Sequence, residues 1–185
     1  MRWIVRLGQE AESAVAWLKD QINTFDTAQL DSIRIDRGRS RYEGVYGHCL
    51  YPTKARSTFR MSCHLPGPFP CTIVTRKPPL YPRSDGTFAR APRGCRRSVL
   101  CYDPQSGRQW YRLLGKTRLH EINQAAVWIV SHEAFHFLRH TRQVKGRNNE
   151  IEADRFADDM MQCFCSQQTL SLPAAKRQLT LPWAG

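Results

Sequence analysis

The 185-residue sequence lacks long apolar runs. Residues 1–21 contain only a short apolar patch before charges appear, which does not suit the apolar core of a signal peptide. No stretch approaches the roughly 20 apolar residues that a membrane-spanning helix needs. The seven cysteines include no Cys-x-x-Cys pair, and their odd number does not suit a disulfide framework. These absences favour a cytoplasmic protein with reduced thiols and no membrane span.

Negative charge is scarce between residues 33 and 118. This segment has 18 Lys and Arg against 4 Asp and Glu, a balance of +14, whereas the rest of the chain has a balance of −2. Such a field favours nucleic acid or another acidic partner, and a merely solubilising surface is an equally good alternative. Binding of a partner through residues 33–118 is therefore an expectation, and the charge alone does not choose the partner.

The apolar pattern changes along the chain and predicts an α+β fold. Helical spacing of apolar residues indicates a helix over about 9–25. The middle of the chain then consists of short β-rich runs broken by Pro and Gly, which predict a small, mainly antiparallel sheet with a hairpin turn at 103–109. Two helices are expected over about 120–142 and 149–168, with Gly146 as the stop of the first and Asn148 or Asn149 as the N-cap of the second.

These elements are expected to form one domain over residues 1–185. Its parts are an N-terminal helical region (1–32), a basic β-rich subregion (33–118), two catalytic helices (119–168) and a tail without a clear element (169–185).

Polar residues interrupt the apolar helix predicted over 120–142. His132 and His136 are four residues apart, so their imidazoles project from one helix face and can bind one metal ion. Glu133 follows the first histidine directly. This HExxH order is typical of sites in which two neutral imidazoles bind zinc and the glutamate is the general base. Two satisfied core histidines with an exposed glutamate are the alternative, which is disfavoured because an unpartnered buried charge costs several kcal/mol.

A zinc site also needs a third protein ligand, and helix geometry separates the candidates. His140 lies about 12 Å along the axis from His132, too far for both to bind the same ion. Glu150 and Asp154 are four residues apart on one face of the next helix, whereas Glu152 points roughly 160° away from Asp154. Either member of the Glu150–Asp154 pair can bind the ion while the other holds a histidine.

Residues 128–161 resemble the gluzincin metallopeptidases. "HEAFH" followed by "NEIEADRFA" is similar to their HExxH motif and second motif Glu-x-x-Ala/Ser-Asp, and "EIEADRFA" is nearer still to the ImmA/IrrE metallopeptidases, which act on transcriptional repressors. The resemblance implies that Glu150 is the third zinc ligand and that Asp154 orients His132. It departs from the families at Phe135, where many have Gly, and at Asp154, where ImmA/IrrE proteins often have Asn.

The resemblance also implies a zincin-like fold. In such a fold the sheet packs on the HExxH helix, the following helix carries the third ligand, and an extended substrate pairs with an edge strand, here from residues 41–114.

The expected function is that of a zinc-dependent metallopeptidase with one Zn²⁺ ion. Glu133 would take a proton from a zinc-activated water during attack on the peptide carbonyl. The group that stabilises the oxyanion is not identified by the sequence; the candidates for contact with the oxyanion or the substrate are His140, Tyr51, Tyr102 and Tyr111. The alternative is a basic nucleic-acid- or partner-binding protein whose zinc site is structural or catalytically idle.

Overall fold

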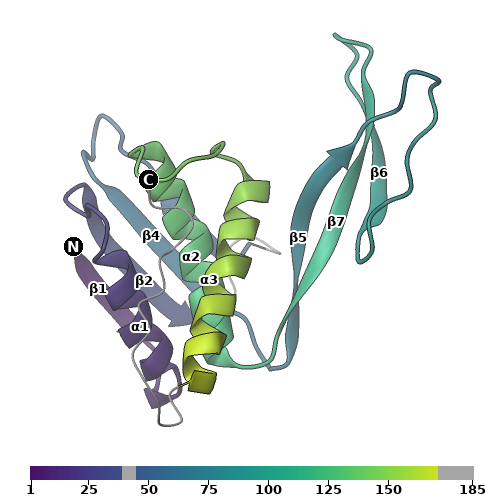
Figure 1. Ribbon diagram of the computed structural model, residues 1–185. Helices are drawn as coiled ribbons and strands as arrows, with labels where there is room; N and C mark the ends of the chain where they lie inside the picture. The colour runs from purple at the N-terminus through teal and green to yellow at the C-terminus, as the bar shows by residue number, and fades with distance from the viewer. Residues whose placement is uncertain (39–44, 171–185) are drawn as a thin grey trace. The chain divides into compact units, whose positions relative to one another are not determined.

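The computed structural model describes residues 1–38 and 45–170 and divides the chain into two compact units (Figure 1). Unit 1 comprises Met1–Cys71 with Leu119–Gly185, and unit 2 comprises Thr72–Arg118. The strands predicted within the basic subregion 33–118 are therefore divided between both units. The expected α+β class is confirmed. The tail predicted from residue 169 lies outside the described residues from residue 171 onward.

The sheet of unit 1 has four strands. Their order is β1 (Arg2–Arg6), β2 (Leu30–Arg37), β4 (Phe59–Leu65) and β3 (Gly47–Leu50). The pairs β1–β2 and β2–β4 are parallel, and only β3 runs antiparallel, along the edge of β4. The sheet in this unit is thus mixed, and the expectation of a mainly antiparallel sheet on the active-site helix was wrong.

The error arose in the first 37 residues, where only a helix was predicted. The edge strand β1 has five residues, four of them exposed, so it lacks the alternation that marks a half-buried strand. The burial of β2 also departs from strict alternation, and its register with β4 shifts between Leu30 and Ser32. The predicted helix is present as α1 (Glu12–Ile22), and it forms the crossover that lets β1 and β2 run parallel.

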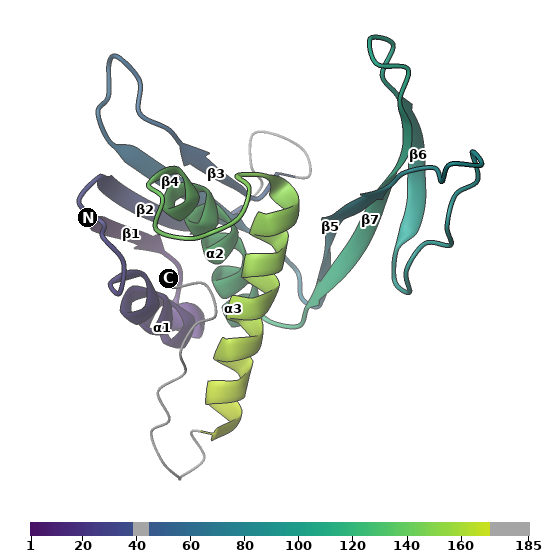
Figure 2. The ribbon, with the colours of Figure 1, turned by 45° about the horizontal axis from the view of Figure 1, so that its top comes forward.

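Three helices cover one face of this sheet (Figures 1 and 2). The central one, α2 (Ile122–His140), contacts β4, β3 and α1, and its other side contacts α3 (Glu150–Leu170). It is buried on nearly all sides, as the sequence predicted. Phe59 of β4 meets Phe137 of α2 edge to face at 5.2 Å between ring centroids. None of the helices formed by residues 1–38 and 45–170 has the length and apolar character needed to cross a membrane.

The connection between α2 and α3 returns the chain toward α2. Gly146 was expected to end α2, but the helix ends at His140 and the left-handed residue after it is Arg142, with φ 62°. Its N–H donates to the Arg139 carbonyl, and the next N–H donates to the Leu138 carbonyl, which is the Schellman pattern. At the start of α3 the Oδ1 of Asn149 accepts two backbone N–H groups at 3.0 Å, which confirms Asn149 as the N-cap.

Unit 2 is a three-stranded sheet. Its strand order is β5 (Cys71–Leu80), β7 (Gln109–Leu119) and β6 (Arg96–Tyr102). The β6–β7 pair is antiparallel, and its connection at 103–108 confirms the predicted hairpin. Thr75 and Lys77 lie close over Gly115, since an added Cβ there would be 3.0 Å from Oγ1 of Thr75 and 2.5 Å from Cε of Lys77. These contacts pack β5 and β7 closely on one face.

Candidate metal centre

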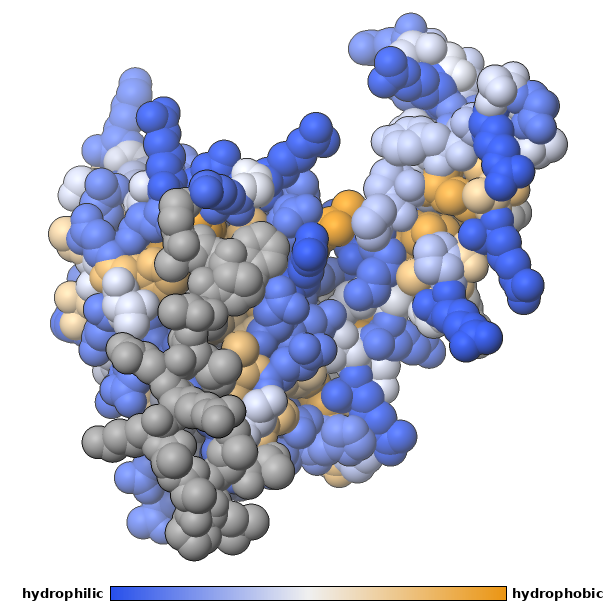
Figure 3. Space-filling view, viewed as in Figure 1, coloured by the Kyte–Doolittle hydropathy of each residue, from blue (hydrophilic) through white to orange (hydrophobic). Residues whose placement is uncertain are grey.

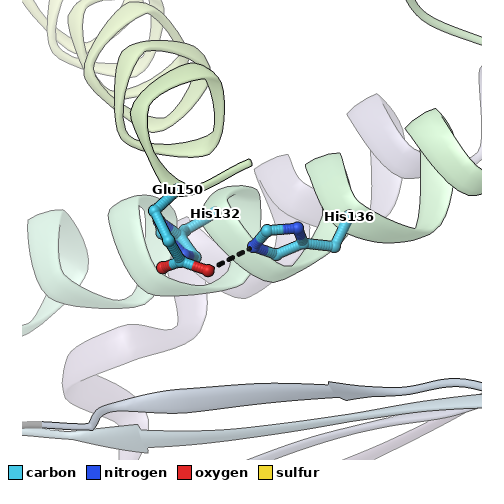
Figure 4. Close-up of side chains that lie close together, drawn as sticks. All are labelled: His132, His136 and Glu150. Atoms are coloured by element: carbon cyan, nitrogen blue, oxygen red, sulfur yellow. Dashed lines mark ion pairs between the residues drawn. The ribbon is translucent and has the colours of Figure 1, made fainter. Parts of the chain in front are cut away.

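The two histidines of the HExxH motif lie together on α2, and Glu150 joins them from the first turn of α3 (Figure 4). The Nε2 of His132 is 3.4 Å from Oε2 of Glu150, and the Nε2 of His136 is 3.6 Å from Oε1 of the same carboxylate. One ligand atom from each of the three residues lies within 4.8 Å of the others. This cluster could therefore hold a metal ion.

The chemistry of the donor set fits zinc. Two imidazole nitrogens and one carboxylate oxygen are the ligands of catalytic zinc sites that keep a fourth position open. The histidine side chains are 12% and 11% exposed, whereas Glu150 is 45% exposed. The cluster is thus closed on the α2 side and accessible on the side of the carboxylate.

A polar side chain lies next to the Nδ1 atom of each histidine, on the side of the ring away from the cluster. The Nδ1 of His132 lies 3.0 Å from Oδ1 of Asp154, whose side chain is only 6% exposed. The Nδ1 of His136 lies 2.9 Å from Oδ1 of Asn148, and the amide nitrogen of Asn148 donates in turn to Oη of Tyr51 at 3.1 Å. A proton on each Nδ1 leaves the lone pair of each Nε2 directed at the cluster, which is the tautomer that a metal requires.

The metal-free cluster binds protons unequally. Burial lowers the pKa of His132, but the contacts of its ring with Asp154 and Glu150 outweigh burial and raise this pKa to about 9. Burial lowers the pKa of His136. His132 is therefore the histidine that has to release a proton when a metal binds near neutral pH.

Glu133 is buried beside the cluster and is fixed by β3. Glu133 is 6% exposed, and burial raises the pKa of its carboxyl to about 7. A backbone hydrogen bond from Cys49 acts to lower this pKa. Gly47 makes room for it, since a Cβ at that position would lie 2.6 Å from Cγ of Glu133. A carboxylate held here can take up and return a proton next to the three candidate ligands.

The outer edge of β3 faces this site. The N–H of His64 donates to the carbonyl of Tyr46 at 2.7 Å, which starts an antiparallel ladder in which every second residue of β3 bonds to β4. Gly47 and Cys49 are the alternate residues, so their peptide groups point away from β4. The hydrogen bond from the Cys49 backbone to Glu133 agrees with this direction.

The remaining residues named from the sequence lie in other surroundings. Glu152 lies near the connection, with its Oε2 3.6 Å from where a Cβ of Gly146 would be. His140 is exposed one turn beyond His136, and its ring contacts Tyr51 and Phe59 at centroid distances of 5.0 and 5.1 Å. Tyr111 belongs to unit 2, and its ring meets Phe88. A role for His140 or Tyr111 at the oxyanion stays a prediction.

Sequence reasoning missed several residues that hold the site. Trp128 stacks on His132 at 5.4 Å between ring centroids and donates from Nε1 to Asp158 at 2.8 Å. Helix spacing could have identified Trp128, since it precedes His132 by four residues. Gly47 and Asn148 carried no such signal for this role, because they reach α2 only through tertiary packing. Tyr51 was named as a candidate for contact with the oxyanion or the substrate, and its hydrogen bond to Asn148 was not foreseen.

Comparisons with known proteins add no assignment. No protein-family model, curated protein or solved structure matches the chain. Any function proposed for the protein therefore depends on its own residues and their geometry.

Proposed function

We propose that this protein is a zinc-dependent metallopeptidase with a zincin-like arrangement of its catalytic helices. One observation carries the proposal: the side chains of His132, His136 and Glu150 converge within 4.8 Å, with the buried carboxyl of Glu133 next to the first of them. A structural zinc site would have four protein ligands, whereas three ligands with a neighbouring acid are typical of hydrolytic sites. The resemblance of residues 128–161 to gluzincin and ImmA/IrrE metallopeptidases is in accord with this proposal.

The roles of the side chains follow from their positions. When bound, zinc would polarise a peptide carbonyl and lower the pKa of water. Glu133 accepts the proton of the attacking water and returns it to the leaving amine. Asp154 and Asn148 keep the two imidazoles in the ligand tautomer.

We assign the substrate to the outer edge of β3. An extended peptide can form a further antiparallel strand on the peptide groups of Gly47 and Cys49, which point away from β4. Because Cys49 also donates a hydrogen bond to Glu133, a peptide bound there lies beside the general base. The first unit thus supplies ligands, base and substrate edge within α2, α3 and β3.

The proposal includes a location in the cytoplasm. All seven cysteines are free thiols. Thiols persist in a reducing compartment, where disulfides are rare.

The test combines metal analysis with matched substitutions. Purified wild-type protein is expected to hold one zinc ion per chain and to cleave a reduced, alkylated protein mixture or itself, with fragments identified by mass spectrometry. Glu133→Gln should keep the zinc and lose at least about 100-fold in rate. Glu150→Gln should lose the zinc.

Glu152→Gln is the matched control for Glu150→Gln. It makes the same change two residues along α3, at the third helical position where glutamine also suits the N-terminal turn. It should retain both zinc and activity. Absence of stoichiometric metal in the wild-type protein would contradict the proposal. Zinc bound with full retention of wild-type cleavage in Glu133→Gln would remove Glu133 from the mechanism.

A second function is favoured by the concentration of positive charge outside the catalytic helices. Residues 33–118 carry a balance of +14, which suits a nucleic-acid- or partner-binding protein whose zinc site is structural or idle. If wild-type protein binds zinc but leaves the protein mixture, itself and DNA-bound proteins uncut, this alternative replaces the peptidase.

A further inference from the structure

Unit 2 carries most of the positive charge of the protein. Residues 72–118 contain 11 Lys and Arg against 2 Asp and Glu, a balance of +9 out of the total of +12. The rest of the chain is nearly neutral for its size. This charge lies on a small three-stranded sheet, so its density is high.

Both carboxylates of unit 2 accept hydrogen bonds from neighbouring residues within turns of the chain. Asp85 accepts hydrogen bonds from the backbone N–H and the hydroxyl of Thr87 at 2.8 and 2.7 Å, which lower the pKa of its carboxyl. Asp103 accepts from the hydroxyl of Ser106 and from the N–H of Gln105, and its pKa is lowered in the same way. Neither residue lies within a strand. The strands therefore contain cations and no carboxylate.

Four of the five cations of β5 and β7 lie on one face of the sheet, and Lys77 lies on the other face. Along β7 the residues Arg112, Lys116 and Arg118 are exposed, whereas Leu113 and Gly115, which alternate with them, are buried. The side chains of Thr75 and Lys77 share the face of Gly115, so Arg76 lies on the opposite face of β5. That opposite face is the one with the exposed cations of β7.

Exposed rings lie near one end of the same sheet. Tyr81 is 56% exposed and Tyr102 is 59% exposed. A hollow of about 360 Å³ is lined by Tyr81, Pro82, Gly107, Arg108 and Gln109. Tyr102 stands opposite Gln109 in the β6–β7 register, so its ring adjoins this hollow. Tyr102 therefore lies on the face of Leu100 and Tyr111, opposite to the face of Arg112 and Lys116.

Apolar side chains are exposed on both faces of the sheet. Val99 pairs with Arg112 on the cationic face, whereas Leu100 pairs with Tyr111 on the other face, and these two apolar residues are 54% and 49% exposed. Apolar side chains of unit 2 come to the surface among hydrophilic residues (Figure 3). A lipid surface would require the apolar side chains on one side. The carboxylates of an acidic peptide could neutralise the cations, but they do not stack on the exposed rings as bases do.

We propose that unit 2 binds single-stranded nucleic acid. The exposed cations of β7 follow the phosphate backbone along one face of the sheet. The nucleic-acid strand then passes round the end of the sheet at Arg108, where Tyr81 and Tyr102 stack on bases at the hollow. Binding of this kind combines a salt-dependent charge term with base–aromatic stacking and needs no base sequence. The inference depends only on unit 2, and it does not depend on the proposed peptidase activity.

The first test measures the charge term in the full-length protein. Binding of a labelled oligothymidylate of about 20 nucleotides, long enough for one site, is followed by fluorescence anisotropy at several salt concentrations. The double variant Arg112→Glu with Lys116→Glu should weaken binding at least about tenfold and reduce the salt slope by roughly 1.4 for two lost phosphate contacts. Lys54→Glu with Lys145→Glu makes the same change of net charge at exposed positions of unit 1 and should weaken binding less than about threefold.

The second test measures stacking, and it does not change the charge. Tyr102→Ala should weaken binding about fivefold or more with an unchanged salt slope, and Tyr102→Phe should retain wild-type binding because it keeps the ring. A Tyr102→Phe variant that binds normally also shows that the unit folds with a substitution at this position.

Three outcomes would overturn the inference. The first is equal weakening by the charge reversals in the two units. The second is Tyr102→Ala binding that matches wild type. The third is tighter binding to phosphatidylserine vesicles or to poly-glutamate than to the oligonucleotide. Glu133→Gln should bind the oligonucleotide like wild type, so loss of peptidase activity and loss of nucleic-acid binding are separable.

Discussion

Asn148 illustrates how a single side chain sets the state of the candidate metal centre. Its carbonyl oxygen lies 2.9 Å from Nδ1 of His136, and its amide is occupied by Tyr51. We predict that Asn148→Ala weakens zinc binding by about 10- to 100-fold, because His136 loses the partner that fixes its tautomer. Zinc affinity is measured by competition with a fluorescent chelator.

Asn148→Asp is the matched control, since it keeps an acceptor for the Nδ1 proton. Its zinc affinity should stay within a few-fold of wild type or exceed it. Equal losses in the two variants would show that Asn148 does not act through hydrogen bonding to His136.

Gly47 is a second position at which a small change should alter the site, because the absence of a Cβ there leaves room for the Glu133 side chain. An added Cβ would lie 2.6 Å from Cγ of Glu133, so Gly47→Ala must displace either the carboxyl or β3. Misplacement of a general base by about 1 Å can cost on the order of 100-fold in rate. We therefore predict a fall in kcat of at least about tenfold with zinc content unchanged, measured by peptide cleavage and metal analysis.

Gly8→Ala provides the comparison, because its Cβ would meet its nearest neighbour at an ordinary 3.8 Å. It should leave kcat unchanged. Full activity in Gly47→Ala would mean that the position of Glu133 against β3 is not required for catalysis.

At the scale of the elements, the turn after α2 determines how α3 delivers Glu150. Arg142 adopts the left-handed conformation that closes the Schellman pattern, although residues with a Cβ lose about 1 kcal/mol or more there. We predict that Arg142→Gly has a free energy of unfolding about 1 kcal/mol greater than Arg142→Ala. Both variants lose the same charge, so the difference isolates the backbone. Urea unfolding of the zinc-free proteins is the measurement, and equal stabilities would contradict the assigned conformation.

At the scale of the whole molecule, metal binding should couple to stability through protons. The pKa of His132 is raised to about 9 by its contacts in the folded, metal-free protein, above its ordinary value of 6.5. Its stabilising contribution is therefore complete below pH 6.5 and is lost as pH rises through about 9. Because zinc binds the neutral imidazole, the stabilisation of the folded protein by zinc increases over the same pH range.

We accordingly predict that saturating zinc raises Tm more at pH 8.5 than at pH 6.5, measured by scanning calorimetry against chelator-treated protein. His136→Ala should show little zinc-dependent change of Tm at either pH. A zinc-induced rise in Tm that decreases toward high pH would contradict the proposed ligands.

The sequence identified the helices that bear the candidate ligands because helical periodicity is a local property. The four-residue spacing of His132 and His136 already places both imidazoles on one face. The choice between Glu150 and Asp154 remained open on spacing alone. The structure brings Glu150 to both Nε2 atoms and Asp154 to Nδ1 of His132, and the roles of zinc ligand and orienting residue stay predictions.

The sequence by itself determined the α+β composition, the buried α2 and the pairing of His132 with His136, since each follows from residue type and short-range spacing. Tertiary structure alone decided that β1, β2 and β4 run parallel, that β3 brings Gly47 and Cys49 to Glu133, and that Asn148 and Tyr51 support His136. It also divided the basic segment between two units and concentrated +9 on residues 72–118. These features depend on which strands pair and which side chains meet across the core, and contacts between residues distant along the chain leave no periodic pattern in the sequence.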